Sequence, residues 1–412
     1  MEQYSDRLKT RLNDDAYEYR RESFISFLKS PIRDYKESPT VKDYVEITES
    51  ELERMANGEP GTPFSLNQEK YRGNILVAGK ELKLDTSLSK TGVDVISLSG
   101  FRKNQNPELF QHIFSEMGRE RIEFLINSSW SEGLVVTIPA GKSVSLSSTT
   151  VTAADESGAR KTVVICGDDS VVEYADKYFT EGNGNGVQGK NIYFILGRNA
   201  KVKYLYLQDK SSSVTDITFV RQIMEQYSEF NFYHINHGSN KVLFSDESVQ
   251  NGANSDFRVY GVNFSSGTQK MDIRDSSFQV GKKSTAEIFV RGVVTGSSST
   301  IHRGNIDLEE VSINSSGFYD SKILLLSKDG YANSKPGLMI KNSNTRSKHG
   351  SSISNVDPEQ IFYLRSRGID IKTARNIITG GFVGSMIERA NNREFTEKIN
   401  EYAESLDIDA YF

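Results

Sequence analysis

A polar turn recurs through residues 133–341 at intervals of about 30 residues, and this repetition constrains the fold more than any other feature. Clear copies are GDDS at 167–170, GRNA at 197–200 and GKKS at 281–284, each followed by a strand-like run. Runs of strand type without helical periodicity occur at 134–138, 162–166, 192–196, 202–207, 230–235, 257–264, 286–294 and 322–326. The pattern predicts many short strands joined by tight turns.

Three all-β architectures could accommodate such a series of strands. A propeller would show a regular four-strand blade motif, which is missing, and a sandwich uses far fewer strands. A β-helix fits the pattern, because each coil buries its inner face against its neighbours and leaves polar side chains outside. Lys201, Lys203, Asn231, Arg258 and Glu287 are candidates for such outward positions.

The regions on either side of these strands have a different residue pattern, which favours helices. Residues 1–130 are expected to be mostly helical, with helices ending before Pro31, over 48–56 and over 107–126, and with short strands at 74–78 and 93–98. Three helices are expected near 357–368, from 371 onward and over 393–406. The chain is thus divided into an N-terminal region (1–130), a β-helix core (131–341) and a C-terminal helical domain (342–412).

Composition excludes several functions. The 50 basic and 55 acidic residues give a net charge of -5, and no clustered basic face suggests nucleic-acid binding. The longest apolar run, 323–326, is far too short to cross a membrane, and the first residues do not resemble a signal peptide. We therefore expect a cytoplasmic protein that binds neither nucleic acid nor membranes.

Few side chains could bind a soft metal, since the chain has one cysteine and five histidines. Cys166 lies in an apolar run (VVIC) and is expected to be a buried core residue. His234 and His237 could share one side of a strand end, but no third ligand is near them. His349 is expected just past the last strand and before the C-terminal helices, where an imidazole could bind iron.

Motifs at this junction and upstream resemble the SufB/SufD family of iron–sulfur cluster assembly proteins. The similar segments are GLVVTIPAG at 133–141, SKPGLMI at 334–340, SKHGSS at 347–352 and DPEQIFYLRSRG at 357–368. The most specific is FYLRSRGI at 362–369, which matches the family pattern almost residue for residue. The glycine after His349 makes the chain similar to SufD, because SufB-like chains have glutamate there.

The resemblance implies a right-handed parallel β-helix flanked by helical regions. It further implies a non-catalytic scaffold of the SUF system that pairs with a SufB-like subunit, or with itself, and docks a SufC-like ABC ATPase, where ATP is hydrolysed. His349 would be a cluster-assembly ligand shared with the partner. The ATPase would dock on the C-terminal helix through Phe362, Tyr363, Leu364, Arg365, Arg367 and Gly368.

Two departures from the family limit the chemistry that this resemblance implies. Ser347 stands where the family often has cysteine, and Tyr319 aligns with the cluster-building cysteine of SufB. Because clusters use about four cysteine-type ligands, the chain is not expected to hold one alone. No tightly bound cofactor is expected, only a transient cluster at a subunit interface.

Two alternatives remain open. One is a homodimeric ATPase-binding scaffold without cluster chemistry. The other is a carbohydrate-active β-helix protein, for which Asp246, Asp272 and Asp275 are the available acids.

Overall fold

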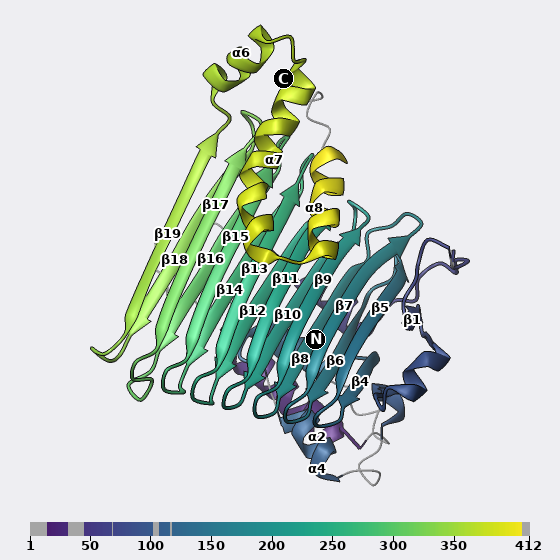
Figure 1. Ribbon diagram of the computed structural model, residues 1–412. Coiled ribbons are helices and arrows are strands. Elements are labelled where there is room, and N and C mark those ends of the chain that lie inside the picture. Colours follow the sequence, from purple (N-terminus) through teal and green to yellow (C-terminus); the bar gives the residue numbers. More distant parts are fainter. Residues whose placement is uncertain (1–14, 32–44, 68, 102–106, 116–117, 406–412) are drawn as a thin grey trace.

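The computed structural model describes residues 15–31, 45–67, 69–101, 107–115 and 118–405, and its dominant feature is a parallel β-solenoid (Figure 1). Two sheets form its walls. Sheet I has the strand order β19-β17-β15-β13-β11-β9-β7-β5-β1-β2, and sheet II has the order β18-β16-β14-β12-β10-β8-β6-β4-β3. Successive strands alternate between the sheets, so each coil contributes one strand to each wall. The predicted fold class, a mainly β parallel β-helix with helices at both ends, is confirmed.

The strands of the solenoid are mostly of equal length, as expected from the repeated turn. Sheet I contains β5 (Ser143–Ala153), β7 (Val171–Glu181), β9 (Lys201–Lys210), β11 (Glu229–Gly238), β13 (Asp256–Ser265), β15 (Thr285–Val294), β17 (Ser316–Leu325) and β19 (Arg346–Asn355). Sheet II contains β4 (Glu132–Ile138), β6 (Gly158–Cys166), β8 (Val187–Leu196), β10 (Thr215–Met224), β12 (Lys241–Gln250), β14 (Lys270–Gln279), β16 (Ser299–Leu308) and β18 (Tyr331–Ile340). Strand β19 lies beyond residue 341, where the sequence predicted that the β-helix ends.

The recurring turn forms one corner in six successive coils, from the β6–β7 turn to the β16–β17 turn. At this corner a residue adopts the left-handed conformation, and its N–H donates a hydrogen bond to a carbonyl of the next coil, as Asp169 does to Arg198 at 2.9 Å. The residues in this position are Asp169, Asn199, Tyr227, Asn254, Lys283 and Asn314. Short polar residues tolerate this conformation best, which explains why the turn could be recognised in the sequence.

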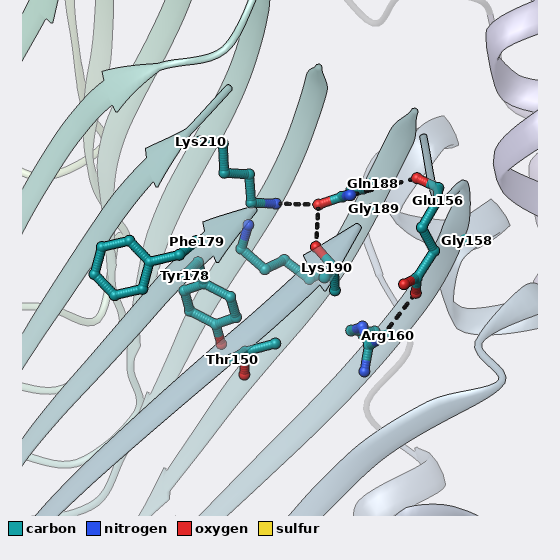
Figure 2. A pocket seen from close by; sticks show the side chains of 11 residues that line it. Thr150, Glu156, Gly158, Arg160, Tyr178, Phe179, Gln188, Gly189, Lys190 and Lys210 are labelled. Carbon is teal, nitrogen blue, oxygen red and sulfur yellow. Dashed lines mark hydrogen bonds and ion pairs between the residues drawn. The ribbon is translucent and has the colours of Figure 1, made fainter. Parts of the chain in front are cut away.

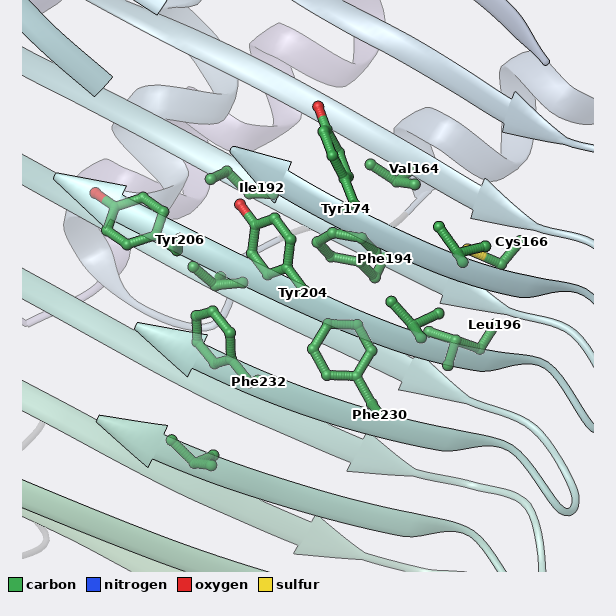
Figure 3. Packing of buried hydrophobic residues seen from close by; sticks show 14 of the residues in the cluster. Val164, Cys166, Tyr174, Ile192, Phe194, Leu196, Tyr204, Tyr206, Phe230 and Phe232 are labelled. Carbon is green, nitrogen blue, oxygen red and sulfur yellow. The ribbon is translucent and has the colours of Figure 1, made fainter. Parts of the chain in front are cut away.

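Aromatic side chains fill the solenoid between the two sheets (Figure 3). Phe194 of sheet II lies 4.5 Å from Tyr204 and 5.0 Å from Phe230 of sheet I, measured between ring centroids. Tyr204 stacks on Phe232 of the following coil at 5.3 Å. Outside, Lys203, Asn231, Arg258 and Glu287 occupy one register column, as predicted for outward polar residues.

The N-terminal region begins with helices that cover the outer face of sheet II. These helices are α2 (Tyr17–Lys29), α3 (Glu49–Asn57), α4 (Pro107–Ser115) and α5 (Arg121–Ser129). Their apolar side chains form one buried cluster with outward residues of β6, β8 and β10, among them Val163, Tyr193 and Phe219. Thr48 and Glu51 form the predicted capping box of α3.

The single helix predicted over 107–126 is wrong, because the structure has α4 and α5 in its place. The Glu123 carboxylate accepts hydrogen bonds from the backbone N–H of Arg119 at 2.7 Å and forms a capping box with Glu120. This cap starts a new helix at Arg121. Part of the predicted first helix, residues 8–12, lies outside the described residues.

Short strands and 3₁₀ turns complete the N-terminal region. They are β1 (Ile75–Ala78), β2 (Glu81–Leu84) and β3 (Asp94–Ser97), with 3₁₀ turns at Thr86–Lys90 and Leu98–Gly100. β2 pairs antiparallel with β1, and β3 pairs antiparallel with β4, so both sheets end here in strands of reversed direction. The strands predicted at 74–78 and 93–98 are confirmed as β1 and β3.

Three helices follow the last strand: α6 (Pro358–Ser366), α7 (Ile371–Ala390) and α8 (Arg393–Ser405). α7 and α8 cover the outer face of sheet I (Figure 1), where Val383, Phe395 and Tyr402 are buried against outward residues of β9, β11, β13 and β15. Residue 406, the predicted end of the third helix, lies outside the described residues.

Candidate functional site

The last coil of the solenoid, formed by β18 and β19, is the first component of the site, and we call it the open end. Neither strand contains a buried residue, whereas the preceding β16 and β17 bury most of their alternate positions. Met339, Ile340 and Ile353 are 37%, 46% and 43% exposed. β18 and β19 are also the edge strands of their sheets, so one side of each carries unpaired backbone groups.

His349 lies within β19 and not past the last strand, which corrects its predicted position. It pairs in register with Tyr319 of β17, and its side chain is exposed. In parallel strands, register partners point to the same side, and Tyr319 points into the core. His349 therefore occupies an inward-facing position of a coil whose two strands, β18 and β19, contain no buried residue.

Tyr319 closes the core directly beneath the open end. It is fully buried, and its hydroxyl donates a hydrogen bond to the Arg303 carbonyl oxygen at 3.0 Å. Its ring fills the space beside Gly304, where an added Cβ would lie 2.0 Å from the ring. Tyr319 thus has a packing role in the core.

No thiolate is available near the open end. Cys166 is 1% exposed, as predicted for a core residue, and burial raises the pKa of its thiol to about 12. It belongs to β6, in the first coils, far along the solenoid from β19. Among the described residues, no three His, Cys, Asp or Glu side chains are grouped so that they could hold a metal ion. A cluster at His349 would therefore need ligands from another chain.

Helix α6 is the second component of the site. It begins at the predicted cap, where Asp357 accepts a hydrogen bond from the Glu359 N–H at 2.9 Å, and contains no buried residue. Gly368 follows it with φ +85°, a conformation that favours glycine. Figure 1 shows α6 standing away from the solenoid.

The predicted docking residues lie together on and just after α6. Phe362 and Tyr363 are 75% and 58% exposed, and the Arg367 guanidinium lies 5.3 Å from the centre of the Tyr363 ring. Arg365 is also exposed, while Leu364 is half-buried. Two large exposed aromatic side chains beside arginines are typical of a protein interaction surface.

α7 and α8 attach α6 to the solenoid. Asp209 of β9 accepts hydrogen bonds from His237 at 2.9 Å and from the Tyr402 hydroxyl of α8 at 3.0 Å. The His237 ring stacks on Tyr402 at 4.3 Å. His234 instead lies inside the solenoid, so the expectation that both histidines could face one side is wrong: three residues along a strand separate opposite faces.

The acids considered for glycan cleavage lie inside the solenoid or in an ion pair. Asp246 and Asp275 are fully buried between the sheets, and Asp272 forms an ion pair with Arg303 at 2.9 Å. No glycan bound to an outer groove could reach the first two.

Sequence reasoning missed an interior polar cluster. Asp275 lies 3.1 Å from His234 Nε2, and Gln222 donates a hydrogen bond to Asp246 at 2.7 Å. A signal was present, since Gln222, Asp246 and Asp275 stand at inward-facing strand positions, but polar residues there are usually assigned to the outside.

Among the described helices, none combines the length and apolar character that a membrane-crossing helix requires.

Comparison with known proteins identifies the family of the chain. The family model described as "SUF system FeS cluster assembly, SufBD core domain" matches residues 149–382. The chain is 26% identical over 215 residues to the chloroplastic protein ABCI7 of Arabidopsis thaliana, covering 52% of this chain and 45% of that protein.

Two further relatives are similar at the same level. SufD of Bacillus subtilis is 26% identical over 231 residues, which cover 55% of this chain and 52% of SufD. The SufBD family protein ycf24 of Galdieria sulphuraria is 27% identical over 195 residues, covering 45% of this chain and 87% of ycf24. The chain thus spans about half the length of the Arabidopsis and Bacillus relatives. With more than half of its residues matched by the family model, the chain belongs to the SufBD family of SUF-system iron–sulfur cluster assembly proteins.

Proposed function

We propose that this chain is a non-catalytic scaffold subunit of an iron–sulfur cluster assembly complex. It pairs with a second β-helix subunit through the open end and receives an ABC-type ATPase on helix α6. The cluster is cargo, built transiently at the interface between the two β-helix subunits.

The single observation that carries this proposal is the open end. Solenoids bury their terminal coil under a cap, because exposed core positions and edge strands promote association. Here the N-terminal end finishes in antiparallel strands, whereas β18 and β19 present inward-facing positions and backbone edges to the outside. A partner β-helix would cover both.

His349 gives the proposed interface its chemistry. The imidazole stands at an exposed position of the terminal strand and can offer one nitrogen to iron. Tyr319 and Ser347 supply no sulfur ligand, so the cysteine and remaining ligands come from the partner.

α6 supports ATPase docking through Phe362 and Tyr363. Because α7 and α8 fasten it to sheet I, a movement of α6 would be transmitted to β9, β11 and β13. The ATPase uses this connection to strain the paired solenoids and open the interface.

Affinity purification of the tagged chain from native cells tests the assembly. We expect an ABC ATPase and a second β-helix subunit in the eluate. Recovery of the ATPase with only this chain would favour the homodimeric scaffold, and recovery of neither would refute the proposal.

Variants separate the two surfaces. Ile353→Arg at the open end should abolish capture of the β-helix partner, whereas Val171→Arg, at an equally exposed apolar side chain (both 43%) at the start of β7, should not. Phe362→Ala with Tyr363→Ala should abolish ATPase capture, whereas Tyr227→Ala, another exposed aromatic (44%), should not. Equal losses in test and control variants would contradict the assignment of surfaces.

His349→Ala tests the ligand. We expect the purified complex to assemble normally, with an unchanged thermal midpoint, and to lose the absorbance of the reconstituted cluster. Lys348→Ala on the same strand is the matched control. Full cluster yield in the His349 variant would remove the ligand role and leave the scaffold role intact.

A further inference from the structure

Inside the first coils, the buried charged groups are matched within the chain itself. A small cavity lies there between Lys190 and Lys210 (Figure 2), and both ammonium groups donate to the Asp216 carboxylate. Arg160 also lines the cavity. The remaining carboxyl groups near these cations are Glu132, Glu156 and Asp176. Basic and acidic groups are thus balanced, and this end of the solenoid gives no reason to expect a ligand.

An unusual surface lies instead at the corner next to the open end. The turn between β16 and β17 spans residues 309–315, whereas the other turns at this corner have four or five residues. It carries Val311 and Ile313, which are 54% and 38% exposed. The earlier turns mostly expose short polar or charged residues, such as Asp169 and Asn199. Exposed β-branched side chains are not typical of turns, which favour glycine and short polar residues.

Two further exposed apolar side chains adjoin this turn. Ile340, which is 46% exposed, pairs in register with Leu308, the residue immediately before the turn, and Met339 is 37% exposed. We call Val311, Ile313, Met339 and Ile340 the corner patch. Because Met339 and Ile340 belong to β18, the corner patch is continuous with the open end. Contiguous exposed apolar side chains mark interaction surfaces in globular proteins.

Hydrogen bonds hold the turn in the shape that presents these side chains. The buried Ser312, between the two exposed residues of the turn, donates through its hydroxyl to the Glu309 carbonyl at 2.7 Å. From the next coil, the Asn342 side chain donates to the same carbonyl at 2.8 Å. The Asn314 N–H donates to the Asn344 carbonyl at 2.8 Å. The turn is therefore ordered before any partner binds, which lowers the entropy that binding would cost.

One charged group beside the corner patch is left without an ion pair. Glu309 pairs with Lys341 at 2.6 Å, but Glu310 is exposed and forms no ion pair within the described part of the chain. A partner with a basic side chain opposite Glu310 would complement this charge. Two copies of this chain that met patch to patch would bring two Glu310 carboxylates together instead.

The corner patch and helix α6 lie at opposite ends of the strands. The corner patch precedes the start of β17 and β19, whereas α6 follows the end of β19 (Figure 1). The ten residues of β19 separate the two surfaces by roughly 30 Å, at about 3.3 Å per residue. The two surfaces are thus available to different partners.

We propose that the corner patch binds the β-helix subunit that covers the open end, and that this subunit differs in sequence from this chain. The inference rests on the proposed function and extends the interface from β18 and β19 onto the turn at 309–315. The partner contributes apolar side chains against Val311 and Ile313 and a basic side chain near Glu310. Strand edges alone would allow the partner to shift along β19, whereas a contact at the corner fixes one register.

Hydrogen exchange of the purified complex, compared with that of the isolated chain, tests the extent of the interface. We expect the amides of residues 309–315 to exchange about tenfold more slowly in the complex, together with those of β18 and β19. The turn at 225–228, where Tyr227 is 44% exposed, is the internal control and should not change. Slower exchange in β18 and β19 but not at 309–315 would overturn this inference and leave the proposed function intact. Unchanged exchange in all of them would overturn both.

Two double variants test the chemistry of the corner patch. Val311→Arg with Ile313→Arg should weaken capture of the second subunit by about tenfold and leave ATPase capture and the midpoint of thermal unfolding unchanged. Val171→Arg with Tyr227→Arg adds the same charge at two other corners and should leave both captures unchanged. Equal capture by the two double variants would refute the inference. Recovery of copies of this chain alone, with self-association lost in the first variant, would assign the corner patch to a homodimer and overturn the choice of a different subunit.

Discussion

Replacing Asp246 with asparagine tests how a buried carboxyl group makes the stability of the solenoid depend on pH. Asp246 is fully buried in β12, and Gln222 donates a hydrogen bond to one of its oxygens at 2.7 Å. The other oxygen has no hydrogen-bond partner in the described part of the chain. Asp275, the register neighbour in β14, places a second carboxyl group alongside. Burial, followed by the charge of Asp275, raises the pKa of Asp246 well above its usual value.

The direction of the pH dependence follows from this raised pKa. Below about pH 3.9, the carboxyl group is protonated in both the folded and the unfolded chain, so its titration does not lower the free energy of unfolding. Above it, only the folded chain keeps the proton, so stability falls by about 1.4 kcal/mol per pH unit until the folded group ionises. The amide that replaces the carboxyl group can keep the hydrogen bond from Gln222 and does not ionise. The variant should therefore be more stable than the unmodified protein at pH 8, and the difference should widen as the pH rises from 5 until the buried carboxyl group ionises.

Urea unfolding at pH 5, 6, 7 and 8 measures this gain. The unfolding midpoints of the Asp246→Asn variant should fall less steeply with pH than those of the unmodified protein. Asp329→Asn, in an exposed turn, is the control and should leave the slope unchanged. Parallel pH dependences, or a less stable variant at pH 8, would refute the reasoning.

Three further changes have defined outcomes. The Glu123 carboxylate binds Arg221 through two hydrogen bonds of 2.8 and 3.1 Å, and Glu123→Gln removes this bidentate ion pair. Urea unfolding should show that the free energy of unfolding falls by about 3 kcal/mol. A decrease of less than about 1 kcal/mol would contradict the importance of this pair. Tyr227→Asn relieves a left-handed conformation (φ 62°) and should raise the stability by about 1 kcal/mol, whereas no gain would argue against strain at this corner. Gly261→Ala would place a Cβ 2.1 Å from His234 Nε2 and should lower the midpoint of thermal unfolding. Adding His234→Ser to this variant should restore the midpoint. An unchanged midpoint in the Gly261→Ala variant would show that the interior can adjust.

Much of the fold could be predicted, because its signals are local. The corner turn needs residues that tolerate the left-handed conformation, and Asp169, Asn199 and Asn254 supply them at regular spacing. The capping box at Thr48 and the glycine at 368 likewise depend on a few neighbouring residues. Strands β10, β12 and β14 were harder to recognise, because polar residues occupy their buried positions.

The site was predicted only in part. The sequence predicted helix α6 and its ends, because capping is a local property, whereas its docking residues came from the family resemblance and their exposure from the structure. It placed His349 in a loop, since SKHGSS has no apolar alternation, yet pairing with β17 makes the segment a strand. The cavity between Lys190 and Lys210 had no sequence signal, because its walls come from different coils.

The sequence alone therefore determined that the middle of this protein coils into stacked strands with helices on either side, since turn chemistry and alternation act between near neighbours. Only the tertiary structure decided which sheet face each helix group covers, which polar groups lie inside, and that the last coil is left open. Those features depend on contacts between residues about one coil or more apart, and the energy of such contacts cannot be read from any single segment.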